Sequence, residues 1–386
     1  MLRTAAGSAT AGTSRVRSVR RIVGVDTARG LAVLGMVVAH VGLDDPGRAF
    51  PPGGWSQIAD GRPSALFVLL AGVGLALLSG GHEPVQGTRL VQARLRILVR
   101  AVLLVVLGTA LVRLDTPVVV ILVVYAGLFA AGVAVLRLPR WALVVAALVL
   151  AVGGPFLLQA LQGHVTLDDA HPVELVSVLF GYYYPAVVWF AYVLVGLAVG
   201  RSNLRSGRTH LQLAAWGAGL VVVGHGGAWV LRLALGQVTA LTTSEPHSSS
   251  FFEVTGNIGT CLLVLAGCLA IGVRWPRALA PVSATGAMAL TAYTGQIIAI
   301  WALDDQVVWA PTLGSFLAFL LGTVAFCWAW RAFVGRGPLE WVLHAVSVRA
   351  ADVTPDELPA RRGAAHAPSP DGPEPGADRS GPTQDG

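Results

Sequence analysis

Long apolar runs recur along most of the chain, and they constrain its fold more than any other feature of the sequence. A helix that crosses the hydrocarbon core of a bilayer needs about 20 mostly apolar residues. Such segments occupy residues 24–43, 63–80, 97–114, 117–136, 141–161, 183–200, 211–235, 252–273, 284–303 and 313–334. Residues 172–181 form a shorter run, which we expect at the membrane interface. We therefore predict an all-α, polytopic membrane helix bundle with about ten transmembrane helices.

The composition agrees with this class of protein. Of the 386 residues, 54% are hydrophobic and only 12% are charged, whereas soluble domains carry about 25% charged residues. The net charge of +6 comes from arginine, because the chain contains no lysine. These arginines fall in short connections between apolar runs, which is typical of membrane orientation and not of nucleic-acid binding. We expect the lipid bilayer as a partner and no nucleic acid. The lysine-free, glycine- and alanine-rich composition suggests a bacterium.

The distribution of arginine predicts how the helices are oriented. Alternate connections, counted from the N-terminus, contain Arg15, Arg17, Arg20, Arg21, Arg89, Arg94, Arg96, Arg137, Arg140, Arg201, Arg205, Arg208, Arg274, Arg277, Arg331 and Arg336. The opposite connections contain only Arg48, Arg62 and Arg113, and they carry the acidic residues Asp44, Asp45, Asp60, Asp115, Asp168, Asp169, Glu174, Glu245, Asp304 and Asp305. Since basic loops stay in the cytoplasm, we predict a multi-pass protein of the bacterial plasma (cytoplasmic) membrane with both termini inside.

The ends of the chain differ from its body. Residues 1–21 form a basic arm that we place in the cytoplasm, and residues 22–345 form the transmembrane domain. Residues 346–386 are rich in Pro, Gly and Asp, which predicts a disordered cytoplasmic tail. The three cysteines lie in apolar runs without metal-ligand spacing, so we predict no disulfide and no metal site. The sequence LDTP at 114–117 predicts a tight turn between the third and fourth segments.

The first apolar segment contains three ionisable side chains, Asp26, Arg29 and His40. On a helix at about 100° per residue, Arg29 and His40 lie within roughly 20° of each other, with Asp26 about 60° to one side. Charged groups in a bilayer cost ~2.5–3.5 kcal/mol each, so we expect this helix inside the bundle. Asp26 and Arg29 can pair as a structural feature. His40 is either a hydrogen-bonded bundle residue or a general base near neutral pH.

Three arginines in the third segment are candidates for binding an anionic cofactor. Arg89, Arg96 and Arg100 share one helical face through their i, i+7, i+11 spacing. They could hold the phosphates of coenzyme A, or they could only anchor the helix at the cytoplasmic surface.

Further candidates for contact with a substrate are Trp55, Tyr184, Arg232, Tyr293 and Gln296. Trp55 and Tyr184 could stack on a sugar or belong to an interfacial aromatic belt. Arg232 follows His225 by two turns, which suggests a polar cavity or an anionic ligand, or else a structural pair with Glu253 or Glu245. Tyr293 and Gln296 could contact substrate or bond a neighbouring helix.

The pattern D-x-x-R-G-x-A-x-x-x-M-x-x-x-H, which begins at Asp26 and ends at His40, resembles the first helix of a superfamily of membrane acyltransferases. This superfamily includes heparan-alpha-glucosaminide N-acetyltransferase-like, YeiB-like and acyltransferase-3 proteins. Three further stretches resemble the YeiB-like branch: GYYYPAVVWFAYVLVGLAVGR (181–201), ATGAMALTAYTGQ (284–296) and GPLEWVLH (337–344). The resemblance covers most of residues 22–344.

The resemblance implies a ten- or eleven-helix enzyme that uses cytoplasmic acyl-CoA, with acetyl-CoA as the expected co-substrate. It would acylate a hydroxyl or amine of an extracytoplasmic glycan or lipid-linked acceptor. Arg29 and His40 match the essential Arg and His of acyltransferase-3 proteins, so we expect catalysis at His40, with Arg29 and Asp26 supporting it. A homodimer is a further candidate assembly. The same buried charges would also suit a transporter or channel for a small anionic solute or lipid, or a non-catalytic sensor or assembly factor.

Overall fold

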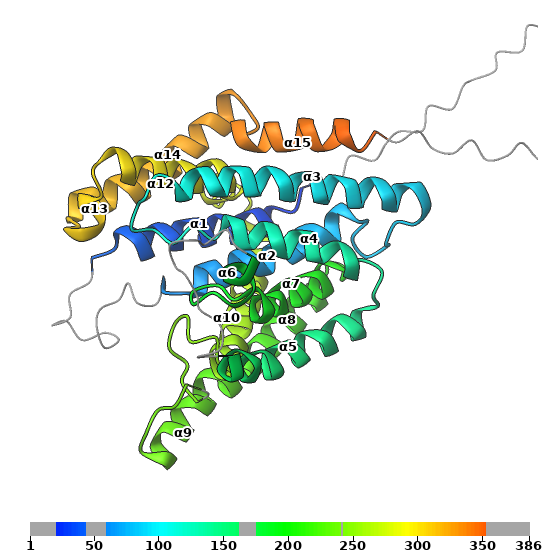
Figure 1. The fold of residues 1–386 in the computed structure, drawn as a ribbon. Coiled ribbons are helices and arrows are strands. Elements are labelled where there is room, and N and C mark those ends of the chain that lie inside the picture. The colour runs from blue at the N-terminus through cyan, green and yellow to red at the C-terminus, as the bar shows by residue number, and fades with distance from the viewer. Residues whose placement is uncertain (1–20, 44–58, 162–174, 241, 353–386) are drawn as a thin grey trace, which may run out of the picture. The chain divides into compact units, whose positions relative to one another are not determined.

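A computed structural model describes residues 21–43, 59–161, 175–240 and 242–352 of the chain, and this part is all-α (Figure 1). All of it belongs to one compact unit that ends at Asp352. Its first helices are α1 (Val23–Val41), α2 (Arg62–Leu78), α3 (Gly87–Val112), α4 (Leu122–Val135), α5 (Arg140–Leu161), α6 (Leu175–Phe180) and α7 (Ala186–Gly200). They are followed by α8 (Gly207–Val221), the π-helical turn η2 (Val222–Gly226), α9 (Gly227–Leu235), α10 (Phe251–Arg274), α11 (Ala280–Ala287), α12 (Ala289–Ala302), α13 (Gln306–Trp309), α14 (Leu313–Phe333) and α15 (Pro338–Ala350).

Each predicted apolar segment lies in helical structure, but the helices differ in length. Six helical stretches are long and apolar enough to cross a membrane: Val23–Val41, Gly87–Val112, Arg140–Leu161, Gly207–Leu235, Phe251–Arg274 and Leu313–Phe333. The helices α2, α4, α7 and α12 have 14 to 17 residues. They therefore span roughly 21–26 Å, less than the ~30 Å of a hydrocarbon core. The chain is a multi-pass membrane protein, and the number of ten crossings stays a prediction.

Two sequence-based expectations about helix boundaries are wrong. The tight turn expected at 114–117 is a longer connection, because α3 ends at Val112 and α4 begins only at Leu122. The single helix expected over 284–303 is broken at Met288 into α11 and α12. The division of the chain at residue 345 stays a prediction: α15 continues to Ala350, and the expected tail from residue 353 onwards lies outside the described residues.

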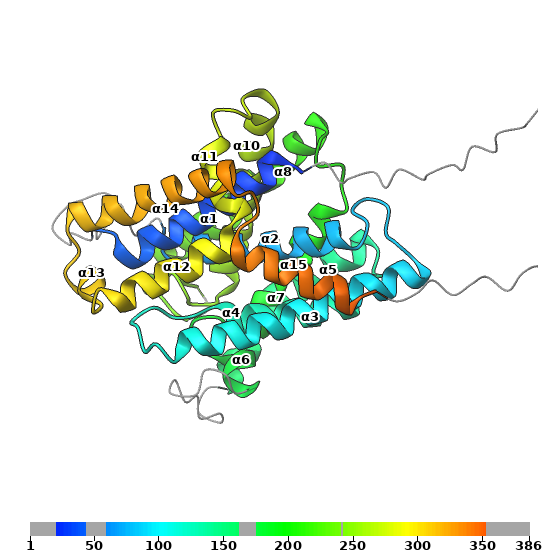
Figure 2. The same ribbon diagram turned by 90° about the horizontal axis from the view of Figure 1, so that it is seen from above.

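Helix α1 lies at the centre of the bundle, as its polar side chains predicted. It packs against α2, α10, α11, α12 and α14 (Figure 2). The backbones of α1 and α11 touch at Gly30 and Gly286: a Cβ on Gly30 would collide with the carbonyl oxygen of Val282, and one on Gly286 with that of Asp26. Glycine therefore fixes the position of α11 beside the ionisable residues of α1.

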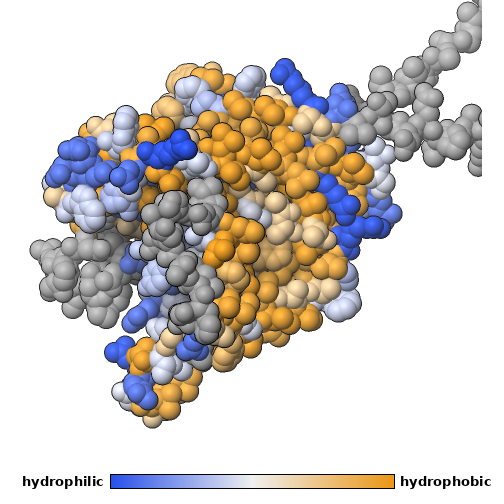
Figure 3. All heavy atoms as spheres, in the orientation of Figure 1, coloured by the Kyte–Doolittle hydropathy of each residue, from blue (hydrophilic) through white to orange (hydrophobic). Residues whose placement is uncertain are grey.

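The surface of the bundle is apolar over a broad area. Figure 3 shows hydrophobic residues across the middle of one face, with hydrophilic residues gathered towards two opposite sides. Helix α5, for example, exposes Val144, Val145, Leu148 and Val149. A continuous exposed apolar surface of this kind is suited to lipid and not to water.

Candidate functional site

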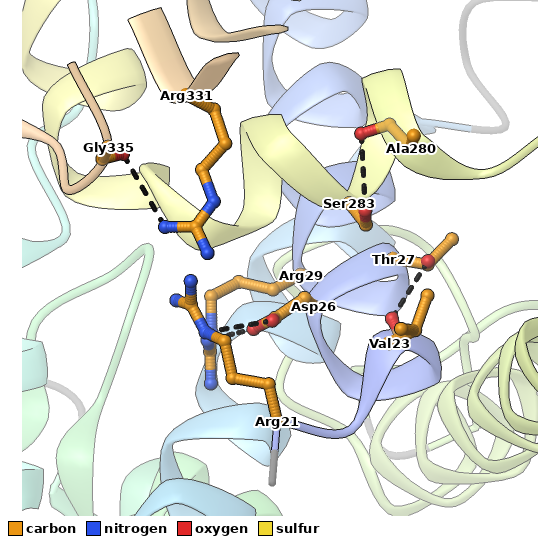
Figure 4. Close-up of polar contacts among 9 residues, drawn as sticks. All are labelled: Arg21, Val23, Asp26, Thr27, Arg29, Ala280, Ser283, Arg331 and Gly335. Carbon is orange, nitrogen blue, oxygen red and sulfur yellow. Dashed lines mark hydrogen bonds and ion pairs between the residues drawn. The ribbon is translucent and has the colours of Figure 1, made fainter. Parts of the chain in front are cut away.

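A group of charged side chains surrounds Asp26 at the N-terminal end of α1 (Figure 4). One carboxylate oxygen lies 3.4 Å from Nη1 of Arg29, and the other lies 3.3 Å from Nε of Arg21. The guanidinium of Arg331, from α14, points towards the same group. The expected Asp26–Arg29 pair is therefore present. Because one carboxylate pairs with two guanidiniums and a third points towards it, this end of α1 carries an excess of positive charge.

Arg29 also lines a cavity of about 300 Å³, together with Arg100 of α3, Tyr125 of α4 and Glu340 of α15. Most of the remaining lining is apolar. Nε of Arg100 donates to the hydroxyl of Ser347, 3.3 Å away. Arg29 and Arg100 come from different helices, α1 and α3, and both line this cavity.

The carboxylate of Glu340 is engaged by the first turn of α12. It accepts hydrogen bonds from the backbone N–H groups of Leu290 and Thr291 at 2.8 and 3.0 Å, and from the Thr291 hydroxyl at 2.6 Å. A carboxylate at a helix N-terminus satisfies unpaired N–H groups and interacts favourably with the helix dipole. These hydrogen bonds go to α12, and among the described residues Glu340 forms no ion pair with Arg29 or Arg100, although its carboxylate lines the same cavity.

The three arginines expected to bind a cofactor do not share one site. Arg100 lines the cavity, Arg96 is half-buried, and Arg89 is exposed at the start of α3. On α15, partial burial, followed by the neighbouring charges of Arg336, Arg100 and Arg96, lowers the pKa of His344. The charges of Arg96 and Arg336 also act on Arg100, which does line the cavity. The sequence does not predict Arg336 or Glu340 as site residues. The one available signal is that Glu340 is an acidic residue just after the arginines at 331 and 336.

His40 lies at the other end of α1, about 16 Å from Arg29 along the helix axis. Its Nδ1 is 2.8 Å from Nε2 of Gln296 on α12. Gln296 is only 3% exposed, and His40 is half-buried. The structure thus joins two of the predicted site residues that are 256 positions apart.

Tyr293 and Tyr184 have different surroundings. Tyr293, one turn before Gln296, is buried and its hydroxyl accepts a hydrogen bond from the backbone N–H of Ile121 at 3.3 Å. This contact ties α12 to the connection before α4. Tyr184 lines a second cavity of about 280 Å³ with Tyr182, Tyr183 and Asp115. A cavity with tyrosines and a carboxylate could accept a sugar.

The expectation of a deep polar cavity at Arg232 is wrong, because this residue is exposed on α9. Glu253 does not serve as its partner. The Glu253 carboxylate accepts hydrogen bonds from the backbone N–H groups of His247 and Ser249, at 2.8 and 2.6 Å. Trp55 lies outside the described residues. Within the described ranges, no group of three or more His, Cys, Asp or Glu side chains is arranged to hold a metal ion.

These features define a multi-pass helical membrane protein whose central helix connects a cationic cavity to a histidine–glutamine pair. Residues 21–233 match the family model described as heparan-alpha-glucosaminide N-acetyltransferase, catalytic. The match covers more than half of the chain, so the chain belongs to this family. A second model, described as a protein of unknown function (DUF418), matches residues 199–350. A search of curated proteins found no match. The two family matches confirm the resemblance to YeiB-like, membrane acyltransferase-like proteins.

Proposed function

We propose that the protein is an integral membrane acyltransferase that uses cytoplasmic acyl-CoA, with acetyl-CoA as the co-substrate. It would acylate a hydroxyl or amine of an extracytoplasmic glycan or lipid-linked acceptor. The observation that carries this proposal is the arrangement along α1: Arg29 lines a cationic cavity at one end, and His40 is held by a buried amide at the other. Membership of the acyltransferase-like family supports the same reaction class.

The cavity at Arg29 and Arg100 suits the phosphates of the acyl donor. Two guanidiniums face one space, and the carboxylate of Glu340 is already engaged by α12. Arginine binds phosphate oxygens through paired, charge-assisted hydrogen bonds. The mostly apolar remainder of the lining suits the less polar arm of the donor, which would carry the thioester along α1 towards His40.

His40 supplies the base for the transfer. Amide oxygen and nitrogen are nearly isosteric, so the contact with Gln296 fits either orientation of the amide. With the amide oxygen accepting from Nδ1–H, the lone pair of Nε2 is left for the acceptor. Nε2 takes the proton of the acceptor hydroxyl or amine, and the acceptor atom attacks the thioester carbonyl carbon. The carbon–sulfur bond breaks, and the imidazolium returns its proton to the leaving thiolate. Gln296 is then a positioning residue.

The arginine bias supports placing Arg29 and the donor on the cytoplasmic side, with both termini inside. His40 then lies nearer the outer surface. A plasma-membrane location in a bacterium and a homodimeric assembly belong to the same proposal.

The first test compares the wild type with His40→Ala, each purified in nanodiscs. Binding of acetyl-CoA and its slow hydrolysis are both measured. We expect His40→Ala to bind acetyl-CoA as the wild type does and to hydrolyse it about 10²–10⁴-fold more slowly, which is the usual contribution of a general base. A folded wild-type sample that binds no short acyl-CoA would refute the proposal. Binding without any turnover would favour the alternative, a transporter of anionic solutes.

A further inference from the structure

A groove separates α12 from α14 on the surface of the bundle. Its volume is about 340 Å³, and small residues line much of it: Gly295 and Ala299 from α12, and Ala318 and Gly322 from α14. A Cβ added at Gly295 or Gly322 would meet no atom within 4 Å, so the groove is open at these two positions. Gln296 lies in its wall.

The groove faces the bilayer. Helix α14 is one of the six stretches long and apolar enough to cross a membrane, yet only Phe316 and Cys327 of its 21 residues are buried. Leu317, Leu321 and Phe326 on this helix are exposed. Hydrophobic side chains exposed along such a helix contact lipid chains. Lipid is therefore the molecule with direct access to this groove.

The side-chain amide of Gln296 is a polar group in the wall of the groove, and only one of its two polar atoms has a hydrogen-bond partner among the described residues. One atom of its amide contacts His40, and the other, Oε1, has no hydrogen-bond partner among the described residues. Rotating the amide by 180° would leave the nitrogen without a partner instead. If the amide oxygen is the free atom, the ligand must supply a hydrogen-bond donor. If the amide nitrogen is the free atom, the ligand must supply an acceptor. A hydroxyl group can be either, and it is the ligand group that fits both orientations.

We propose that the groove binds a lipid with a free hydroxyl, which enters sideways from the bilayer between α12 and α14. The hydroxyl bonds the incomplete side of the Gln296 amide, and the other side of that amide holds His40. This inference rests on the proposed function and narrows its acceptor to a lipid-borne alcohol. The hydroxyl oxygen would take the acyl group, its proton would pass to His40, and the thiolate would leave with that proton.

The test uses a photoactivatable dioleoylglycerol, with a diazirine on one chain, in phosphatidylcholine nanodiscs. We expect its crosslinks to map to α12 and α14. Unlabelled dioleoylglycerol should compete, and its deoxy analogue, in which hydrogen replaces the hydroxyl so that it can neither donate nor accept a hydrogen bond there, should compete about two- to tenfold less well. The double variant Gly295→Leu/Gly322→Leu should lose the crosslinks, because its side chains fill the groove. Gly267→Leu is the matched control, since this exposed glycine of α10 also meets no atom within 4 Å.

Crosslinks spread evenly over the lipid-facing helices, or unchanged in the double variant, would overturn the inference. The readout needs no acyl transfer, so it is independent of the proposed function. Acetyl-CoA hydrolysis without these crosslinks would overturn only the lipid acceptor. Crosslinks that depend on the hydroxyl, in a protein that does not bind acetyl-CoA, would support the lipid site and refute the transferase.

Discussion

At the scale of single residues, the charged side chains of α1 divide into two roles. Asp26 is held between Arg29 and Arg21, so it orients guanidiniums and lies far from the proposed chemistry. The imidazole of His40 hydrogen-bonds to the neutral side-chain amide of Gln296 and not to a carboxylate. The residue pattern alone indicated that these groups face protein and that Asp26 and Arg29 could pair, but it left open whether His40 is a base or only a hydrogen-bonded bundle residue.

Arg100 and Arg89 provide a matched pair for testing the cationic cavity. Arg100 lines it with Arg29, whereas Arg89 is exposed on the same helix. We expect Arg100→Gln to weaken acetyl-CoA binding about ten- to hundredfold, the usual effect of losing a charge-assisted hydrogen bond. Arg89→Gln should leave binding unchanged. Isothermal titration in nanodiscs measures both dissociation constants. Equal effects of the two substitutions would mean that the arginines attract the donor only by their general surface charge.

At the scale of helices, close packing between α1 and α11 determines where the charged residues lie. A Cβ at Gly286 would meet backbone atoms of Asp26 and Gly30, which cannot move independently of α1. We expect Gly286→Ala to lower the free energy of unfolding by about 1–3 kcal/mol, as overpacking does. Thermal unfolding in detergent provides the measurement.

Gly74→Ala on α2 is the control for that substitution, because a Cβ there would meet no atom within 4 Å. In a helix interior, alanine is favoured over glycine by roughly 0.5–1 kcal/mol, so this variant should be as stable as the wild type or slightly more so. If both variants unfolded at the same temperature, the contact between α1 and α11 would not be as tight as described.

The break between α11 and α12 shows what sequence periodicity could not predict. Residues 284–303 form one apolar segment in the sequence, and nothing near Met288 breaks the pattern as a proline would. The start of α12 is satisfied by Glu340, which lies 50 residues further along the chain from Leu290. The His40–Gln296 contact has the same origin: each residue was selected from its own segment, but only the tertiary structure brings them together. Arg232 was misplaced because its helical neighbours do not reveal whether another helix covers it.

At the scale of the whole molecule, hydropathy predicted the all-α bundle and the positions of its helices. It did so because a helix that crosses a bilayer needs about 20 mostly apolar residues, and few other structures contain such long apolar runs. It could not establish which of the shorter helices cross the bilayer. Tilt, breaks and burial by neighbouring helices make a 14-residue helix such as α12 ambiguous on length alone.

The crossing by α11 and α12 can be tested with two cysteine variants. Arg277→Cys and Gln306→Cys place a thiol at exposed positions on the two sides of this broken helix. The native cysteines, all buried, are first replaced by alanine. We expect a membrane-impermeant maleimide to label Arg277→Cys only from the cytoplasmic side and Gln306→Cys only from the opposite side, in vesicles of known orientation. Labelling of both from one side would reject this crossing, and with it the placement of both termini in the cytoplasm.

The bond between Glu340 and α12 also has a consequence for the order in which the protein is assembled. Synthesis proceeds from the N-terminus, so the residues of α12 emerge 50 positions before the carboxylate that caps them. Until α15 has been made, the N–H groups of Leu290 and Thr291 lack this acceptor. The orientation of α12 that holds Gln296 against His40 is therefore completed only after every candidate membrane span has been synthesised. A nascent chain that stopped before α15 would contain all the residues of the proposed reaction and still lack the contact that fixes the start of α12.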